Sequence, residues 1–295
     1  MKRSVILNPA AGAVKDLDAV LRQLERLNAS RIHVTRTRGA AERFARDAAR
    51  NNHYDEVIVA GGDGTLNEVV NGIAVRGSHV RLGLIPLGTG NDFARCLNLP
   101  GTIVDNIDII LSGKTKAIDL VRAKSARTRY FVNVSAGGFS GLVDEKLTPK
   151  LKRAWGPLAY VRSAAAALPE LRAYRTTVRF DRRKKVDVDL YNVVIANGRF
   201  VAGGLPIAPA ADASDGLLDV ILIPQRPGPE IAVLVGKILL GSHLTSDALT
   251  FRRAKRVAIR SRPGMWFNVD GELIGNDPIV FEIVPRALQF AVAKK

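Results

Sequence analysis

The chain has 295 residues, of which 47% are hydrophobic and 24% are charged, and this composition excludes wholesale disorder. A chain of this length is long enough for two domains. Its single cysteine, Cys96, excludes an internal disulfide and is typical of a reducing compartment. No stretch approaches the roughly 18 uncharged apolar residues that a membrane-spanning helix needs. We therefore expect a cytoplasmic protein, peripheral to the inner face of the membrane at most.

The charge of the chain is strongly basic. Lys and Arg outnumber Asp and Glu by 44 to 28, which gives a net charge of +16. This excess favours anionic partners, namely nucleic acid, anionic lipid or nucleotide phosphate, but a solvated basic surface would explain it equally well. The basic run Arg182-Arg183-Lys184-Lys185 is interpreted as the tip of a hairpin rather than as a binding motif.

The first 120 or so residues alternate between strand and helix patterns. The expected strands are 4–7, 31–35, 56–60 and 80–85, and the expected helices are 18–27, 40–50 and 66–75. Short apolar strands joined by helices predict a parallel α/β sheet. We assign this domain to residues 1–125.

After about residue 125 the pattern is mostly that of strands. The expected strands are 130–134, 176–180, 186–196, 217–223, 257–260, 265–269 and 279–284. They predict an antiparallel β-sandwich over residues 126–295, and a return of the last strand to the first domain stays open. Two helices are expected within it. Segment 149–168 suits either packing on the β domain or contact with a membrane, whereas the apolar segment 230–240 is predicted to be core.

The most informative segment is Gly61-Gly62-Asp63-Gly64-Thr65, between a buried strand and a helix. Glycines let backbone N–H groups approach a phosphate, and a helix N-terminus adds positive potential. A carboxylate among such groups needs a counter-cation, which Mg²⁺ carried by a nucleotide would supply. The alternative is a tight turn with nothing bound, in which Thr65 and Glu68 form a T-x-x-E capping box.

A second glycine-rich segment, 85–93, follows the next strand. In a parallel sheet the carboxyl ends of neighbouring strands lie at one edge, where ligands bind. We therefore expect Thr89, Asn91 and Asp92 to face Asp63, with 8–12 completing the rim. The plainer alternative is that Asn91 or Asp92 caps a helix.

Five markers in order resemble the diacylglycerol kinase catalytic-domain superfamily, in particular the bacterial soluble lipid kinases and their sphingosine kinase relatives. The markers are Asn8-Pro9-x-x-Gly12, Gly61-Gly62-Asp63-Gly64-Thr65-x-Asn67-Glu68, Pro86-Leu87-Gly88-Thr89-x-Asn91-Asp92, Asp215-Gly216-x-Leu218-Asp219 and Asp270-Gly271-Glu272. Together they cover nearly the whole chain. They are more specific than Gly-Gly-Asp-Gly-Thr alone, which NAD kinases also carry.

The resemblance implies a fold and a set of site residues. The fold is an NAD kinase-like, nucleotide-binding parallel α/β domain joined to an antiparallel β-sandwich, with the active site in the cleft between them. The implied cofactors are ATP and Mg²⁺. The nucleotide-binding residues would be Asn8, Pro9, Ala10, Ala11, Gly12, Thr35, Gly61, Gly62, Asp63, Gly64, Thr65, Leu66, Asn67, Glu68, Thr89 and Asn91.

The same resemblance implies three acidic sites. Asp63, Asp92 and Asp119 would organise the catalytic Mg²⁺ and its waters. Asp215, with the main-chain carbonyls of Asp212 and Leu217, would hold a structural Mg²⁺. Glu272 would be the general base, so the catalytic residues are Glu272, Asp63 and Asp92.

The local sequence supports two interpretations of Glu272. Asp270-Gly271 is typical of a hairpin turn, which makes Glu272 a residue at its edge. Its apolar neighbours Leu273 and Ile274 would also suit a carboxylate that accepts a proton from a hydroxyl on an apolar substrate.

The leading hypothesis is an ATP-dependent lipid kinase that phosphorylates diacylglycerol or a related glycerolipid and gives a phospholipid such as phosphatidic acid. It would meet its lipid at a membrane surface, without nucleic acid, and a homodimer stays open. One alternative is an NAD kinase-like phosphotransferase on a soluble acceptor. The other is a non-enzymatic basic protein that binds nucleic acid or lipid, for which only Arg199-Phe200 and Arg129-Tyr130-Phe131 interleave base and aromatic residues.

Overall fold

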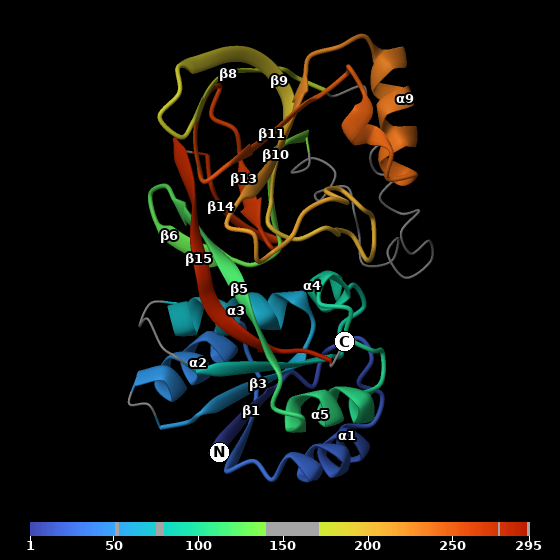
Figure 1. Cartoon of the computed structure of the whole chain (residues 1–295), viewed down its shortest axis with the longest axis vertical. Coiled ribbons are helices and arrows are strands. Elements are labelled where there is room, and N and C mark those ends of the chain that lie inside the picture. Colours follow the sequence, from blue (N-terminus) through green and yellow to red (C-terminus); the bar gives the residue numbers. More distant parts are fainter. Residues whose placement is uncertain (51–52, 75–79, 140–170, 277, 294–295) are drawn as a thin grey trace. The chain divides into compact units, whose positions relative to one another are not determined.

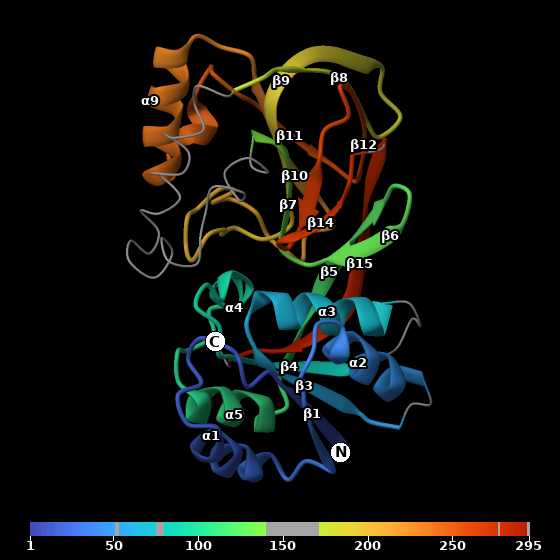
Figure 2. The same cartoon turned by 180° about the vertical axis from the view of Figure 1, so that it is seen from behind.

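The computed structural model describes residues 1–50, 53–74, 80–139, 171–276 and 278–293, and it divides into two compact units (Figures 1 and 2). Unit 1 comprises Met1–Leu120 and Pro285–Lys295, and unit 2 comprises Val121–Val284. The chain leaves unit 1 in the middle of strand β5 (Thr115–Lys124) and returns within β15 (Ile279–Ala291). The expected helix 149–168 lies outside the described residues.

Unit 1 is built on a parallel sheet. Its strands are β1 (Arg3–Leu7), β2 (Arg31–Val34), β3 (Glu56–Gly61) and β4 (Arg81–Pro86), in the order β2-β1-β3-β4. All of these pairs are parallel, and β15 adds a further parallel pair with β4 through Gln289 and Phe290. Every residue of β3 is buried, because helices cover both faces of the parallel sheet, and the strand is apolar apart from Glu56, which pairs with Arg3 and Arg81.

Two pairs of helices cover the two faces of this sheet (Figure 1). Helices α1 (Leu17–Leu24) and α5 (Ile103–Leu111) share one core cluster with residues of β1, β3 and β4. Helices α2 (Ala40–Arg50) and α3 (Asp63–Ala74) pack on each other on the other face. They approach so closely that a Cβ on Gly72 of α3 would lie 2.4 Å from the Glu42 carbonyl oxygen of α2.

Unit 2 is antiparallel in every strand pair whose register is recorded. Its further strands are β6 (Thr128–Phe131), β7 (Val134–Gly138), β8 (Tyr174–Phe180), β9 (Lys185–Ala196), β10 (Leu218–Pro224), β11 (Thr250–Ala254), β12 (Arg256–Arg262), β13 (Phe267–Val269) and β14 (Glu272–Gly275). The long strand β9 organises the unit, because it pairs with β8 and β7 along one edge and with β10 along the other. The rings of Phe131, Phe267 and Phe281 meet in its core at centroid distances of 5.5 to 6.1 Å.

The predicted architecture of a parallel α/β part followed by an antiparallel β part is confirmed. The sequence patterns missed α5, the short helix α4 (Asp92–Cys96), β5 and β11. The sequence of α5, Ile-Val-Asp-Asn-Ile-Asp-Ile-Ile-Leu, is rich in β-branched residues, which individually favour strands. Its N-cap, Thr102, accepts a hydrogen bond from the Asp105 N–H at 3.2 Å and so marks the start of the helix.

Helix α9 (Gly228–Leu239) occupies the segment that was predicted to be a core helix, and that prediction of burial is wrong. Only Ile231 and Leu234 are buried, while Val233 and Leu240 are 60% and 83% exposed. Helix α9 is therefore buried along one narrow face only, which carries Ile231 and Leu234. None of the helices in the described part of the chain has the length and hydrophobicity needed to span a bilayer.

Candidate nucleotide and phosphoryl-transfer site

The loops that follow β1, β3 and β4 lie together at the carboxyl edge of the parallel sheet. The Asn8 N–H donates to the Ala60 carbonyl at 2.9 Å, and the Leu87 N–H donates to the Gly61 carbonyl at 2.9 Å. The Ala13 N–H donates to the Leu87 carbonyl at 2.8 Å. These backbone bonds join the three predicted segments into one continuous rim.

Glycines make this contact between the loops so close that no other residue fits. A Cβ on Gly12 would lie 2.5 Å from Oγ1 of Thr89. A Cβ on Gly62 would lie 2.9 Å from the Cα of Gly88, and one on Gly88 would lie 2.6 Å from the Cα of Gly62. The backbones of the two glycine-rich loops therefore touch directly, and loops of this kind can turn N–H groups toward a phosphate.

The carboxylate of Asp63 links the same two loops through hydrogen bonds. Its carboxylate oxygens accept hydrogen bonds from the N–H groups of Asp92, at 3.1 Å, and Phe93, at 3.2 Å, in the first turn of α4. Asp63 therefore places its negative charge at the N-terminus of α4. Asn91 holds the N-cap position of that helix, as the plainer alternative expected, but its side chain makes no capping hydrogen bond. Asn91 instead closes its own turn, with Oδ1 accepting from the Gly88 N–H at 2.9 Å and Nδ2 donating to the Gly88 carbonyl at 2.7 Å.

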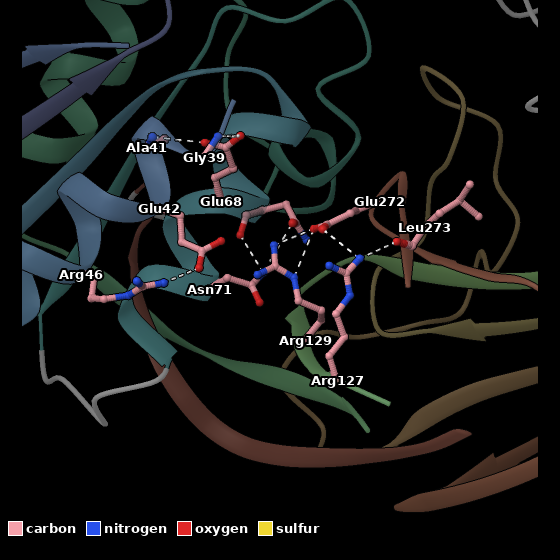
Figure 3. Close-up of polar contacts among 11 residues, drawn as sticks. Gly39, Ala41, Glu42, Arg46, Glu68, Asn71, Arg127, Arg129, Glu272 and Leu273 are labelled. Atoms are coloured by element: carbon pink, nitrogen blue, oxygen red, sulfur yellow. Dashed lines mark hydrogen bonds and ion pairs between the residues drawn. The ribbon is translucent and has the colours of Figure 1, made fainter. Parts of the chain in front are cut away.

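The expected capping box of Thr65 and Glu68 does not form. Helix α3 begins at Asp63, two residues before Thr65, so Glu68 is too far along the helix to cap it. Its carboxylate instead accepts from the N–H groups of Gly39, at 2.9 Å, and Ala41, at 3.1 Å, at the start of α2 (Figure 3). Thr65 Oγ1 accepts from Asn8 Nδ2 at 3.0 Å, which ties the first loop to α3.

The remaining nucleotide-site candidates fall into two groups. Leu66 and Asn67 are buried within α3, where Asn67 Oδ1 accepts from Asn71 Nδ2 at 3.4 Å, and Ala11 is buried in the first loop. Ala10 and Gly64 are exposed, and Pro9 is half-buried beside them in the first loop. Thr35 is buried just beyond β2, where its N–H donates to the Leu7 carbonyl at 2.8 Å.

The acidic residues of unit 1 provide one adjacent pair. Asp63 and Asp92 are joined by the hydrogen bond described above, and Asp92 is buried. Asp119 is fully buried in β5, where its Oδ1 accepts from the Arg286 N–H at 2.7 Å. Among the described residues, no three His, Cys, Asp or Glu side chains are close enough to form a direct metal-ligand cluster.

In unit 2, Arg253 pairs with Asp215, the carboxylate that was expected to hold a structural Mg²⁺. Its guanidinium pairs with Asp215 Oδ2, and its Nε donates to Asp219 Oδ1 at 2.9 Å. Asp215 Oδ1 accepts from the Leu217 N–H at 2.9 Å, and the Asp212 carbonyl accepts from the Asp215 N–H at 3.2 Å. In this arrangement the guanidinium of Arg253 supplies a counter-charge for Asp215. The structural Mg²⁺ stays a prediction.

The electrostatics around Arg253 are those of a partly buried ion pair. Asp219 is 1% exposed, and burial raises the pKa of its carboxyl while the hydrogen bond from Arg253 opposes that rise. The pKa of Arg253 is raised in turn, chiefly by its hydrogen bond to Asp219. The pair joins β10 to the edge strand β11.

Glu272 is the first residue of β14 and lies at the edge of the predicted hairpin. Asp270 and Gly271 both have positive φ, at 44° and 84°, as a two-residue hairpin turn requires. The Arg129 guanidinium donates to Glu272 Oε2 through Nη2 at 2.6 Å and Nε at 3.2 Å. Arg127 approaches Glu272 Oε1 at 3.5 Å and donates to the Leu273 carbonyl at 2.8 Å (Figure 3).

Sequence reasoning missed Arg127 and Arg129 as partners of Glu272. The sequence placed Tyr130 and Phe131 in an expected strand, and it offered Arg129-Tyr130-Phe131 as one of two segments that interleave basic and aromatic residues. Phe131 is in fact fully buried and Arg129 is paired with a carboxylate, so neither of these two residues forms part of an exposed stacking surface. The pairing joins residues 143 positions apart, and no local motif signals it.

Comparisons with known proteins agree with this geometry. The model of the diacylglycerol kinase catalytic domain matches residues 2–123, and the model of the YegS C-terminal NAD kinase beta sandwich-like domain matches residues 133–292. The chain is 32% identical to the diacylglycerol kinase of Staphylococcus haemolyticus, over 98% of this chain and 88% of that protein. It is also 32% identical to the diacylglycerol kinase of Bacillus subtilis, over 100% of this chain and 98% of that protein.

Two solved structures show the same fold. A diacylglycerol kinase structure from Bacillus anthracis has a TM-score of 0.74 at 21% identity and covers 99% of this chain and 97% of its own. An NAD kinase from Archaeoglobus fulgidus in complex with ATP has a TM-score of 0.53 at 15% identity, over 98% and 93%. The predicted NAD kinase-like fold is thus confirmed. With two family models along its length and curated relatives across nearly all of it, the chain belongs to the diacylglycerol kinase family of lipid kinases.

Proposed function

We propose that this protein transfers the γ-phosphate of ATP to the hydroxyl of a membrane lipid, diacylglycerol or a related glycerolipid, and so forms phosphatidic acid or its analogue. The observation that carries this proposal is the contact between Gly62 and Gly88 beside the carboxylate of Asp63. It joins two glycine-rich loops at a helix N-terminus, which is an arrangement suited to phosphate groups.

Phosphoryl transfer needs aligned phosphates, neutralised charge and a base near the acceptor hydroxyl. In the proposed site, backbone N–H groups of the rim bind the phosphates. Asp63 and Asp92 would hold a hydrated Mg²⁺, since carboxylate oxygens are the ligands this ion prefers and each oxygen of Asp63 has used only one lone pair on an N–H group. When bound, the ion would neutralise negative charge on the phosphates.

Glu272 is proposed as the general base that accepts the proton of the lipid hydroxyl. Its side chain is 19% exposed, so it is accessible yet shielded from bulk water. Arg129 holds one carboxylate oxygen from the side, and Arg127 contacts the other only at 3.5 Å. Oε1 therefore keeps lone pairs with which to accept a proton.

The acceptor is inferred from the two relatives named above, both of them diacylglycerol kinases that match nearly the full length of this chain. A lipid acceptor implies peripheral contact with a membrane, and we propose the inner face of the cytoplasmic membrane as the place of action. Similarity to NAD kinase at 15% identity supports the shared fold and gives no reason to choose NAD as the acceptor.

An acceptor panel tests the proposal. The full chain is incubated with γ-labelled ATP and Mg²⁺ and with, separately, vesicles of diacylglycerol, monoacylglycerol, ceramide or sphingosine, and soluble NAD. We expect label in phosphatidic acid with diacylglycerol and none in NADP. Label in NADP alone, or in no product at all, would refute a lipid acceptor.

A further inference from the structure

The basic run 182–185 lies at the turn between β8 and β9, as its sequence predicted, and it borders a cavity of about 380 Å³. The cavity is in unit 2. Its volume is within the range of roughly 300 to 1,000 Å³ typical of small-ligand sites. Neither the glycine-rich loops nor Glu272 contributes to it.

The floor of the cavity is apolar. Phe180 and Leu222 line it and are also members of the main hydrophobic core cluster of unit 2, against which Val188 packs. Val186, at the start of β9, is 48% exposed at the same cavity. An exposed β-branched residue beside an opening into the core presents apolar surface to whatever enters.

The rim of the cavity is cationic. Arg183, Lys184 and Arg252 line it and are exposed. Within the described ranges, none of the three takes part in an ion pair, whereas the neighbouring Arg253 is already paired with Asp215.

The acidic side chains that flank the basic run, Asp181 and Asp187, accept hydrogen bonds from other groups. The Asp181 carboxylate accepts from the N–H groups of Lys255 and Arg256, both at 2.9 Å. Asp187 accepts from the Thr177 hydroxyl. Both carboxylates keep their negative charge, but neither pairs with a cation of the rim, and no acidic residue in the described part of the chain lines the cavity.

We propose that this cavity is a binding site for an anionic phospholipid of the membrane. Arg183, Lys184 and Arg252 would bind the phosphate of the headgroup, since guanidinium and ammonium groups pair strongly with phosphate oxygens. An acyl chain would lie against Phe180, Val188 and Leu222. The cationic rim and the apolar floor together define the ligand class. A free phosphate would leave the apolar floor exposed to water, and a neutral lipid would leave the cations unpaired.

Vesicle flotation of the full chain without nucleotide tests the site independently of catalysis. Neutral phosphatidylcholine vesicles are compared with the same vesicles carrying phosphatidylglycerol. Wild type should float only with the anionic vesicles. Arg183→Glu with Lys184→Glu, and separately Val186→Asn, should reduce the bound fraction. For the double reversal we expect a loss of affinity of roughly tenfold or more, because each basic residue near an anionic surface contributes substantially to binding.

The matched control is Arg260→Glu with Arg262→Glu, which makes the same charge change on exposed residues of β12, opposite the other end of β8 from the hairpin. An equal loss of vesicle binding in the control and hairpin variants would overturn the proposal, because the loss would then come from the change in net charge and not from this cavity. Unchanged binding of the hairpin variant would overturn it too.

A second measurement distinguishes the lipid from its headgroup. Dihexanoyl-phosphatidylglycerol, which is soluble, should raise the melting temperature of wild type, and glycerol phosphate at the same concentration should not. Val186→Asn should reduce the lipid effect. An equal shift with glycerol phosphate, or with a short DNA duplex, would contradict a phospholipid site. These results are separable from the proposed function, since neither experiment involves ATP or turnover.

Discussion

The guanidinium of Arg129 donates two hydrogen bonds to one carboxylate oxygen of Glu272, at 2.6 and 3.2 Å, across 143 residues of chain. Both side chains are largely shielded, at 15% and 19% exposure, so the contact is less screened than a surface ion pair. Arg129 lies in β6 and Glu272 in β14, which makes the orientation of the carboxylate a product of the β unit itself.

Removing Arg129 should therefore slow turnover without weakening nucleotide binding. For Arg129→Met we expect kcat to fall by about tenfold to a hundredfold, because a misplaced catalytic group is costly even at small displacements. The KM for ATP should not change, and Arg129→Lys should recover part of kcat. Steady-state kinetics with a lipid acceptor provide the measurement.

The control for this experiment is Arg122→Met, which breaks a more exposed ion pair with Glu282 in the same unit. It should leave kcat near wild type. If both variants lose activity equally, Arg129 has only a structural role.

The contact between Gly62 and Gly88 predicts a steric effect. Gly88→Ala places a Cβ 2.6 Å from the Gly62 Cα, which forces the loops apart and costs about 1–3 kcal/mol of stability. We expect a lower melting temperature and a smaller stabilisation by ATP. Gly101→Ala, where a Cβ meets nothing within 4 Å, should change neither property.

The ion pair of Arg253 with Asp219 predicts a stability effect in unit 2. Arg253→Met leaves a buried carboxylate without its counter-ion, and because Arg253 is itself 41% exposed we expect a moderate loss of about 2 kcal/mol. Urea unfolding measures it. The double variant Arg253→Met with Asp219→Asn should recover much of the loss, and additive losses would show that the two residues do not interact.

His243 predicts part of the pH dependence of stability. Its side chain is fully buried, with Nε2 2.7 Å from the Ile207 carbonyl, and burial lowers its pKa below 6.5. The unfolded chain therefore binds the proton more readily, so stability is lost as the pH falls below about 6.5. Chemical denaturation at a series of pH values should give a shallower decline for His243→Gln. Burial also lowers the pKa of His33, so the contribution of His33 to the pH dependence of stability should remain in that variant.

That the loops of the candidate nucleotide site lie together could be predicted because their signals are local. Glycine runs at the ends of successive buried strands identify the loops, and parallel topology alone brings strand ends to one edge. The order of those strands and the contact of Gly12 with Thr89 were not predicted, and parallel topology alone does not fix them, because β1 and β4 are not neighbours in the sheet.

The partners of the acidic residues could not be predicted because they depend on long-range packing. Glu68 caps α2 rather than its own helix, and Asp63 caps α4, which the patterns missed. Arg129 and Arg253 each pair with a carboxylate from a strand distant in sequence. Hydrophobic periodicity contains no information on such pairs. It also gave the wrong burial for α9, because the sequence of an apolar segment does not show whether other parts of the chain cover it.

The most direct test of the account compares Glu272→Gln with wild type in two assays of the same preparation. One measures transfer of label from γ-labelled ATP to diacylglycerol in vesicles, and the other measures ATP binding by calorimetry. The account predicts that the variant binds ATP as wild type does and forms at least about a hundredfold less labelled lipid, as expected for loss of a general base. Labelled lipid formed at the wild-type rate by Glu272→Gln would contradict it.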